Sequence, residues 1–245
     1  MKTNKLIVAL DVDNVHKARE LFHRLRGTVG MFKIGFQLFT AAGPTLVREI
    51  VSSGERVFLD LKFHDIPSTV AAAGVLATRL GVSIFNLHAV GGSEMMRRTA
   101  NSVAESAASE GLPRPLIIAV TVLTSADAGT LAEVGFNLDP EVLVPELARL
   151  ADASGMDGIV ASPREIGSVR SAVRRPDFIV VTPGVRPTGS ALFDQRRVTT
   201  PRGAVMAGAD YIVVGRPILD APDPAQAAQR IVDELEVDAA NSATI

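Results

Sequence analysis

Short apolar runs recur along the chain, and each is followed by a segment with the periodicity of an amphipathic helix. Most runs are apolar at every position, which is typical of strands in a parallel sheet covered on both faces. Eight such runs are present, at 6–10, 31–34, 57–61, 83–87, 116–120, 158–161, 178–181 and 211–214. Eight strand–helix repeats in 245 residues predict a single (β/α)8 TIM barrel rather than an open doubly wound sheet.

The segment between the first two runs shows the helical pattern clearly. Either Asp13 or Asn14 can cap its start, because short polar side chains accept hydrogen bonds from the first backbone N–H groups of a helix. Its apolar residues fall on one stripe, formed by Val15, Ala18, Leu21, Phe22 and Leu25.

No Pro-, Gly- or Ser-rich linker divides the chain, so we expect one catalytic domain over residues 1–245. The helical periodicity is lost from about residue 237, and we expect residues 237–245 to form a mobile tail. A long connection is expected at 183–200, after the seventh run. Loops of that length in a compact domain are usually functional or disordered.

Composition and charge exclude several classes of function. The formal net charge of −2 and the pI near 6.1 provide no field that would attract nucleic acid or an anionic membrane. The chain has no cysteine, which excludes disulfides and thiolate metal sites. The apolar run at 6–10 is too short for the core of a signal peptide, and no run approaches the length of a membrane span. We therefore expect a cytoplasmic location, without nucleic-acid or membrane partners.

The third apolar run ends in a dense group of charges. Asp60, Lys62 and Asp65 lie within six positions, and alternate residues of a strand share a face, so Asp60 and Lys62 should project together. Burying such charges is costly unless they compensate one another. This segment alone leaves two readings open, an ion-pair network that fastens the end of a strand and a site of chemistry.

Nearly every predicted strand delivers a polar residue to its C-terminal end, where barrels of this kind build their active sites. Asp11 and Ser162 could each simply cap the following helix. Lys33 and Lys62 cannot be explained in that way, because lysine is a poor cap. The joint pattern of the strand ends favours a site over coincidence, although we do not assign His88 a catalytic role. The polar residues at or just after the strand ends are Asp11, Lys33, Asp60, Lys62, His88, Thr121, Thr124, Ser162, Thr182, Gly215 and Arg216.

The loops after the last two strands predict a phosphate site. In these barrels the loops after strands seven and eight commonly bind phosphate, and here they supply Arg186, Gln195, Gly215 and Arg216. A glycine lets an anion approach the backbone, the following helix offers its N-terminal end, and arginine offers a planar fork for phosphate oxygens. The alternative reading of both arginines is a solvated charge.

Metal and cofactor sites are poorly supported. No phosphate-binding P-loop or dinucleotide fingerprint is present. His64 and His88 have no convincing third partner beyond Asp60 and Asp65, so we expect no metal site.

The chain resembles the orotidine 5′-phosphate decarboxylase family, bacterial type, along essentially its whole length. The Asp-x-Lys-x-x-Asp core alone is shared with phosphosugar decarboxylases and aldolases of the same superfamily, whereas the residues around it favour the orotidylate branch. The matching motifs are Leu-Asp11, Phe-Lys33-Ile-Gly, Asp60-Leu-Lys62-Phe-His-Asp65-Ile-Pro, Asn86-Leu-His88-Ala, Thr121-Val-Leu-Thr124-Ser, Thr182-Pro-Gly-Val-Arg186-Pro, Gln195-Arg-Arg and Val-Gly215-Arg216-Pro.

This resemblance implies a homodimer that converts orotidine 5′-phosphate to uridine 5′-phosphate and carbon dioxide without a cofactor, the last step of de novo UMP synthesis. Lys62 would donate a proton to C6 within a charge array of Lys33, Lys62, Asp60 and Asp65. Asp65, together with Thr69, would complete the site of the partner subunit.

The same resemblance implies how the substrate is held. The ribose hydroxyls would be bound by Asp11 and Lys33, and the pyrimidine by Thr124 with Ser125. The 5′-phosphate would be bound by Arg186, Gln195, Gly215 and Arg216.

Two other functions remain open. One is a magnesium-dependent phosphosugar decarboxylase or aldolase on the same barrel. The other is a non-catalytic barrel that binds a nucleotide or another phosphorylated ligand. Such a protein would keep Gly215 and Arg216 but could dispense with Lys62. A purely structural protein would explain neither the polar strand ends nor the long loop.

Overall fold

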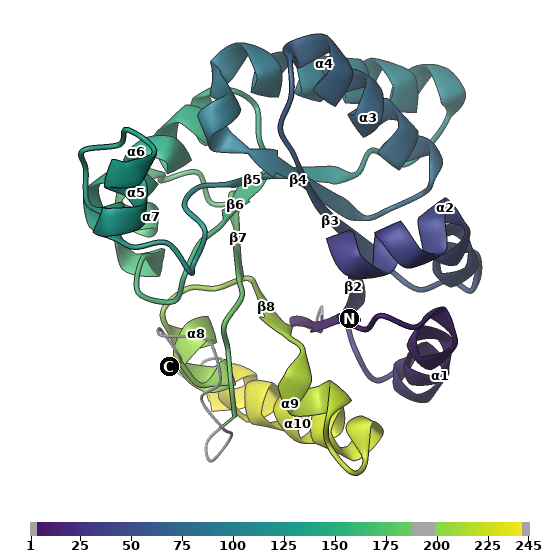
Figure 1. Ribbon diagram of the computed structural model, residues 1–245. Coiled ribbons are helices and arrows are strands. Elements are labelled where there is room, and N and C mark those ends of the chain that lie inside the picture. Colours follow the sequence, from purple (N-terminus) through teal and green to yellow (C-terminus); the bar gives the residue numbers. More distant parts are fainter. Residues whose placement is uncertain (1–3, 188–198, 242–245) are drawn as a thin grey trace.

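The computed structural model describes residues 4–187 and 199–241, with side chains as far as residue 235, and within these ranges eight parallel strands form a closed barrel (Figure 1). Each strand pairs with its neighbours in the sequence, and β8 pairs with β1, so the predicted (β/α)8 barrel is confirmed. The strands are β1 (Leu6–Ala9), β2 (Met31–Gly35), β3 (Val57–Phe63), β4 (Ile84–His88), β5 (Leu116–Val120), β6 (Gly158–Val160), β7 (Ile179–Thr182) and β8 (Tyr211–Val214).

Helices surround the barrel and connect its strands (Figure 1). They are α1 (Val15–Leu25), α2 (Phe36–Ser52), α3 (Pro67–Arg79), the short 3-10 helix η1 (Ala89–Gly91), α4 (Gly92–Glu110), α5 (Ala128–Glu133), α6 (Pro140–Ala153), α7 (Ile166–Ala172), α8 (Pro201–Met206), α9 (Arg216–Leu219) and α10 (Pro224–Asn241).

The C-terminal helix is longer than the sequence pattern predicts. Helix α10 continues to Asn241, past the expected end of the helical pattern near residue 237. Alanine is the best helix former, so Ala239 and Ala240 permit a helix even without an apolar stripe. Residues 242–245, the rest of the predicted tail, lie outside the described residues.

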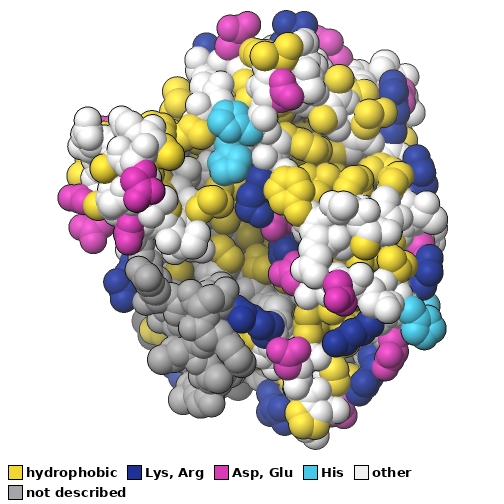
Figure 2. All heavy atoms as spheres, viewed as in Figure 1, with side chains coloured by type: hydrophobic (Ala, Val, Ile, Leu, Met, Phe, Trp, Pro, Cys, Tyr) yellow, Lys and Arg dark blue, Asp and Glu magenta, His cyan; other side chains and the backbone are white. Residues whose placement is uncertain are grey.

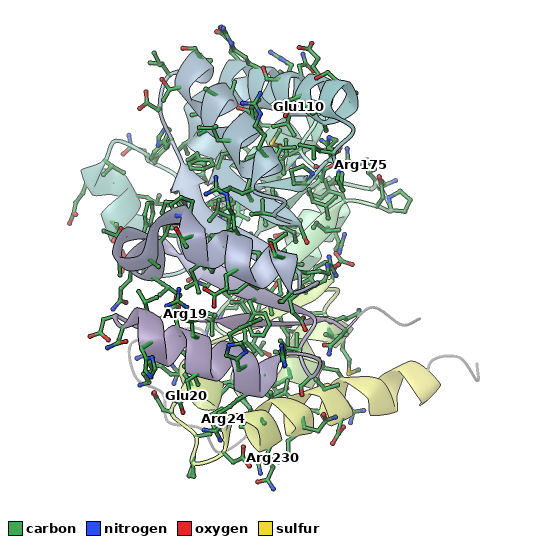
Figure 3. The ribbon with its side chains drawn as sticks, turned by 90° about the vertical axis from the view of Figure 1, so that its right-hand side faces the viewer. Arg19, Glu20, Arg24, Glu110, Arg175 and Arg230 are labelled. Atoms are coloured by element: carbon green, nitrogen blue, oxygen red, sulfur yellow. The ribbon has the colours of Figure 1, made fainter. Side chains whose placement is uncertain are left out.

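Helix α1 shows how the sequence positions one layer of the fold. Asn14 caps it, since its side-chain oxygen accepts hydrogen bonds from the N–H groups of His16 (2.8 Å) and Lys17 (3.2 Å). The apolar stripe packs inward. The outer face carries Arg19, Glu20 and Arg24 (Figure 3).

The hydrophobic core has two parts. A larger layer fills the space between the sheet and the helices, and a smaller cluster fills the inside of the barrel. Four members of the inner cluster, Ala9, Phe58, Val181 and Val213, also form the floor of the cavity described below. Over the described residues, no helix combines the length and the apolar character needed to cross a bilayer.

Close strand contact at Gly158 gives a stability prediction. A Cβ atom at this residue, where β6 begins, would lie 2.1 Å from the carbonyl oxygen of Ile179, so strand backbones would have to separate. We expect Gly158→Ala to lower the free energy of unfolding by about 1–3 kcal/mol or more, the usual cost of overpacking. Urea unfolding followed by circular dichroism measures this change.

Gly167 is the matched control, because it is exposed, lies in helix α7 and has open space around its missing Cβ. We expect Gly167→Ala to be neutral or stabilising by up to about 1 kcal/mol. Equal effects of the two substitutions would contradict the strand contact.

Candidate active site

A cavity of about 590 Å³ opens at the C-terminal ends of the strands. Figure 2 shows a hollow near the middle of this face, with hydrophobic side chains at its bottom and both acidic and basic side chains around it. Strand ends and the loops after them line it, as expected for the active-site end of such a barrel. Predicted site residues among the lining are Asp11, Lys33, Asp60, Lys62, Thr124, Arg186, Gly215 and Arg216.

Four charged side chains form a row of alternating sign along one wall of the cavity. The Lys33 Nζ atom lies 2.9 Å from Oδ1 of Asp11 and 3.2 Å from Oδ2 of Asp60. The other oxygen of Asp60, Oδ1, lies 2.7 Å from Nζ of Lys62. We call Asp11, Lys33, Asp60 and Lys62 the charge row. Each charge inside the row contacts only charges of opposite sign, which is what makes its burial possible.

The two central members of the charge row are buried, each with an exposed fraction of 8%. Burial alone would lower the pKa of Lys33, but the nearby carboxylates of Asp60 and Asp11 outweigh it and raise that pKa above its ordinary value. Burial alone would raise the pKa of Asp60, but the charges of Lys33 and Lys62 and hydrogen bonds from Lys62 and Asn86 lower it. Lys33 and Asp60 therefore stay ionised at neutral pH.

The predicted neighbourhood of Asp60 and Lys62 is confirmed, but regular strand alternation does not produce it. The pairing of β3 with β4 shifts between Leu59 and Phe63, and Lys62 has a φ of 46°. Such a left-handed conformation costs a residue with a Cβ roughly 1–2 kcal/mol. The backbone N–H of Lys62 donates a 2.7 Å hydrogen bond to Oδ1 of Asn86, a residue to which the sequence pattern assigns no role.

A second residue without a predicted role is Gly35, at the end of β2. A Cβ atom here would lie 3.0 Å from Nζ of Lys33 and 3.3 Å from Oδ1 of Asp11. The glycine therefore leaves room for the Lys33–Asp11 ion pair. The motif Phe-Lys33-Ile-Gly contains this residue, and its role becomes visible only when β1 and β2 are placed side by side.

The part of the cavity formed by the loops after β7 and β8 is basic and rich in glycine. Gly184 and Arg186 follow β7, while Gly215 and Arg216 follow β8, and we call these four residues the arginine end. Arg186 is only 5% exposed, and its backbone N–H donates a hydrogen bond to the carbonyl oxygen of Thr199 (2.9 Å).

Gly215 has space around it that a ligand could use. A Cβ atom there would approach no protein atom more closely than 3.6 Å, so packing within the protein does not require this glycine. The helix that follows, α9, has only four residues. Gln195, predicted to share this end, lies outside the described residues.

Residues 4–231 match the orotidine 5′-phosphate decarboxylase / HUMPS family. The chain belongs to this family. The resemblance seen in the motifs is thereby confirmed, and so is the prediction that the chain is an enzyme of this family.

Individual relatives match over nearly the whole chain. The chain is 55% identical to the orotidine 5′-phosphate decarboxylase of Syntrophotalea carbinolica over 232 residues, which covers 94% of each protein. It is 54% identical to that of Geobacter sulfurreducens, covering 94% of this chain and 95% of the relative. The crystal structure of orotidine 5′-phosphate decarboxylase from Lactobacillus acidophilus superposes with a TM-score of 0.83 at 35% identity, covering 94% of this chain and 98% of that one.

Two residues predicted to act in this family's site do not line the cavity of their own chain. Asp65 and Thr69 are exposed, at the connection from β3 to α3 and in the first turn of α3. The carboxylate of Asp65 accepts a 2.6 Å hydrogen bond from the N–H of Ile66. Within one chain, the alternating charges therefore include Asp11 and not Asp65.

Three hydroxyl residues after β5, Thr121, Thr124 and Ser125, are candidates for contact with the pyrimidine, and one of them reaches the cavity. Thr124 lines it, while Ser125 is not among the lining residues. Thr121 is buried, and its hydroxyl donates a 3.1 Å hydrogen bond to the carbonyl oxygen of Val160.

Several other strand ends also stay outside the cavity. Ser162 and Thr182 are buried but do not line it, and the N–H of Ser162 donates to a carboxylate oxygen of Glu165 (2.9 Å). His88 lies beside His64, with ring centroids 5.5 Å apart. Burial and the charges of His64 and Lys62 lower the pKa of His88 against the opposite effect of Asp60. Among the described side chains, no group of three or more His, Cys, Asp or Glu residues could hold a metal ion.

Substituting the central carboxylate of the charge row gives a test of its electrostatics. Asp60→Asn keeps the shape of the side chain but leaves Lys62 without its carboxylate partner at 2.7 Å. We expect the free energy of unfolding at pH 7 to fall by about 3–5 kcal/mol, the cost of removing one partner of a buried ion pair.

This effect should depend on pH in a defined direction. The pKa of Asp60 is lower in the folded state, so its stabilisation is fully present above the unfolded-state pKa of about 3.9 and is lost as the pH falls through the folded-state value. The difference between the wild type and Asp60→Asn should therefore stay constant from pH 7 to about 5 and shrink below about 4. Urea unfolding across this range measures it. The exposed substitution Asp13→Asn should show neither effect, and a difference that grows in acid would contradict the account.

Proposed function

We propose that this chain decarboxylates orotidine 5′-phosphate to uridine 5′-phosphate and carbon dioxide, without a cofactor, as the last step of de novo UMP synthesis. The observation that carries the proposal is one cavity that joins the charge row to the arginine end. The family and the names of its relatives support this substrate.

The reaction needs a stabilised carbanion and a proton. The bond between C6 and the carboxylate carbon breaks, carbon dioxide leaves, and the electron pair stays on C6 in the plane of the ring, where the π system cannot delocalise it. The Lys62 ammonium group stabilises this charge and then gives its proton to C6. Lys62 regains a proton from solvent after the product has formed.

The neighbouring charges prepare Lys62 for this role. Asp60 orients its ammonium group through the 2.7 Å contact, and Lys33 balances the second oxygen of Asp60 at 3.2 Å. Asp60 lines the same cavity and would face the substrate carboxylate. Because the contacts within the charge row orient its members, little reorganisation would be needed when charge develops at C6.

Other cavity residues would hold the parts of the substrate that do not react. Asp11 and Lys33 would bind the ribose hydroxyls, and Thr124 with Ser125 the pyrimidine. Arg186, Gly215 and Arg216, together with Gln195, would bind the 5′-phosphate. In support, Gly215 lines the cavity beside Arg216 and leaves space for phosphate oxygens.

The phosphate and ribose contacts matter for rate as well as for affinity. One pair of unit charges at about 4 Å contributes roughly 4 kcal/mol at an effective dielectric constant of 20. Efficient enzymes lower barriers by roughly 8–23 kcal/mol. The remainder must come from additional interactions, including binding energy from the remote phosphate and ribose that positions the pyrimidine against Lys62.

We also propose a cytoplasmic homodimer in which Asp65 and Thr69 complete the site of the partner. The surface beside them supports this arrangement. Ile66, directly after Asp65, and Leu76, further along α3, have exposed fractions of 64% and 58%. A partner that covered helix α3 would bury these apolar side chains.

The direct test uses purified protein treated with chelator. Orotidine 5′-phosphate is added, the pyrimidine absorbance is followed, and the product is identified as uridine 5′-phosphate. Rapid conversion without metal supports the proposal. No conversion by a folded protein would contradict it, and phosphosugar substrates with added magnesium would be tested next.

Removing the proton donor should stop the reaction. We expect Lys62→Ala to lower turnover by at least roughly 10⁴-fold, because Lys62 would supply both proton transfer and charge stabilisation. Steady-state assays and circular dichroism measure turnover and folding. Lys17→Ala, on the exposed side of α1, is the control and should keep full activity. Near-normal turnover in folded Lys62→Ala would rule out the proton-donor role.

Removing one arginine should weaken phosphate recognition. We expect Arg216→Ala to lower kcat/KM by roughly 10- to 100-fold, in line with the loss of a hydrogen bond to a charged group. Arg230→Ala, on the outer helix α10 (Figure 3), should leave kinetics unchanged. Unchanged kinetics in Arg216→Ala would show that the phosphate binds elsewhere.

A further inference from the structure

The irregular part of β3 faces a single residue of the next strand. Leu59 pairs with Phe85 and Phe63 pairs with Leu87. Between these pairs β3 has three residues, Asp60, Leu61 and Lys62, whereas β4 has only Asn86. Two of the three β3 residues in this bulge carry the charges proposed to act on the substrate.

The side chain of Asn86 joins the two charged residues of the bulge. Its oxygen Oδ1 accepts a hydrogen bond from the backbone N–H of Lys62, and its nitrogen Nδ2 donates one to Oδ1 of Asp60, both at 2.7 Å. The same Asp60 oxygen lies 2.7 Å from Nζ of Lys62. The side-chain amide of Asn86 therefore binds both the backbone of Lys62, the proposed proton donor, and the carboxylate of Asp60, which contacts the Lys62 ammonium group.

Asn86 cannot act on the substrate directly. It is 1% exposed and is not among the residues that line the cavity. Any effect on the reaction must pass through Lys62 and Asp60.

Lys62 needs such a support because its backbone is strained. Lys62 is the one non-glycine residue with a positive φ in the described part of the chain. A residue with a Cβ holds this conformation only where its surroundings enforce it. The accepting oxygen of Asn86 provides that constraint at the N–H of Lys62 itself.

We propose that Asn86 is a positioning residue for the decarboxylation, which holds Lys62 and Asp60 in their reactive arrangement from behind the cavity wall. This role rests on the proposed function. It requires one donor and one acceptor on the same side chain, and neither leucine nor an ionised aspartate supplies both.

Kinetics of three variants between pH 5 and 9 test this role. Asn86→Leu removes both hydrogen bonds at similar volume, and we expect kcat to fall about 100-fold, as for a misplacement of about 1 Å. KM and the affinity for uridine 5′-phosphate should change less than about threefold, because the proposed phosphate contacts lie in the loops after β7 and β8. Thr78→Val, which removes a buried hydroxyl bonded to the carbonyl oxygen of Gly74 on α3, controls for general destabilisation and should keep the wild-type kcat.

Asn86→Asp gives a readout that a merely structural role would not move. Its ionised carboxylate keeps the acceptor but repels Asp60, and its neutral carboxylic acid can donate to Asp60 as the amide does. We expect kcat of Asn86→Asp to rise relative to the wild type as the pH falls, since a carboxyl group beside Asp60 should have a raised pKa. If Asn86→Leu does not fold, the pH profile of Asn86→Asp by itself tests whether Asn86 positions Lys62 and Asp60.

The outcomes separate this role from the proposed function. If the wild type is active, two results would overturn the role of Asn86 only. One is a kcat of Asn86→Leu within threefold of the wild type, and the other is a pH profile of Asn86→Asp that follows the wild type. A folded wild type that does not convert orotidine 5′-phosphate would overturn the proposed function, and the role of Asn86 would fall with it.

Discussion

Two lysines and a carboxylate can lie at the top of an apolar barrel only if opposite charges alternate. The structure satisfies this condition, because Lys33 lies between Asp11 and Asp60, and Asp60 lies between the two lysines. The contacts between neighbouring charges are 2.7–3.2 Å long. Removing any central member would leave a buried charge without its partner. The contacts within the charge row therefore make the burial of its charges possible, and under the proposed function the same row supplies the chemistry of the cavity.

The barrel brings the charge row and the arginine end to one cavity. The charge row starts at Asp11, just after β1, and continues on β2 and β3, while the arginine end follows β7 and β8. Apolar side chains form the floor of the cavity. A phosphorylated ligand held at the arginine end would present its other end to the charge row. This arrangement agrees with the family to which the chain belongs and with the relatives that match nearly its whole length.

Much of this structure could be predicted from the sequence, because strands that are apolar on both faces and polar residues at strand ends are local features of the chain. The barrel followed from them. The expected approach of Asp60 to Lys62 is also found, although a strand bulge and not regular alternation produces it. The strand bulge at β3 did not follow, since it depends on how β3 pairs with β4. For the same reason Asn86 and Gly35 had no predicted role. Asn86 forms its hydrogen bonds across a strand pair, and Gly35 lacks the Cβ atom that would crowd the Lys33–Asp11 ion pair. A position at a strand end also does not suffice to place a residue in the cavity, because Thr121, Ser162 and Thr182 are buried but do not line it.

The most direct test of the account is a crystal structure of the protein with bound uridine 5′-phosphate. We expect Nζ of Lys62 to be the nearest protein nitrogen to C6 of the pyrimidine, and the phosphate to lie against Gly215 and Arg216. A phosphate bound beside Lys33 and Lys62, or a pyrimidine with C6 facing away from the charge row, would contradict it.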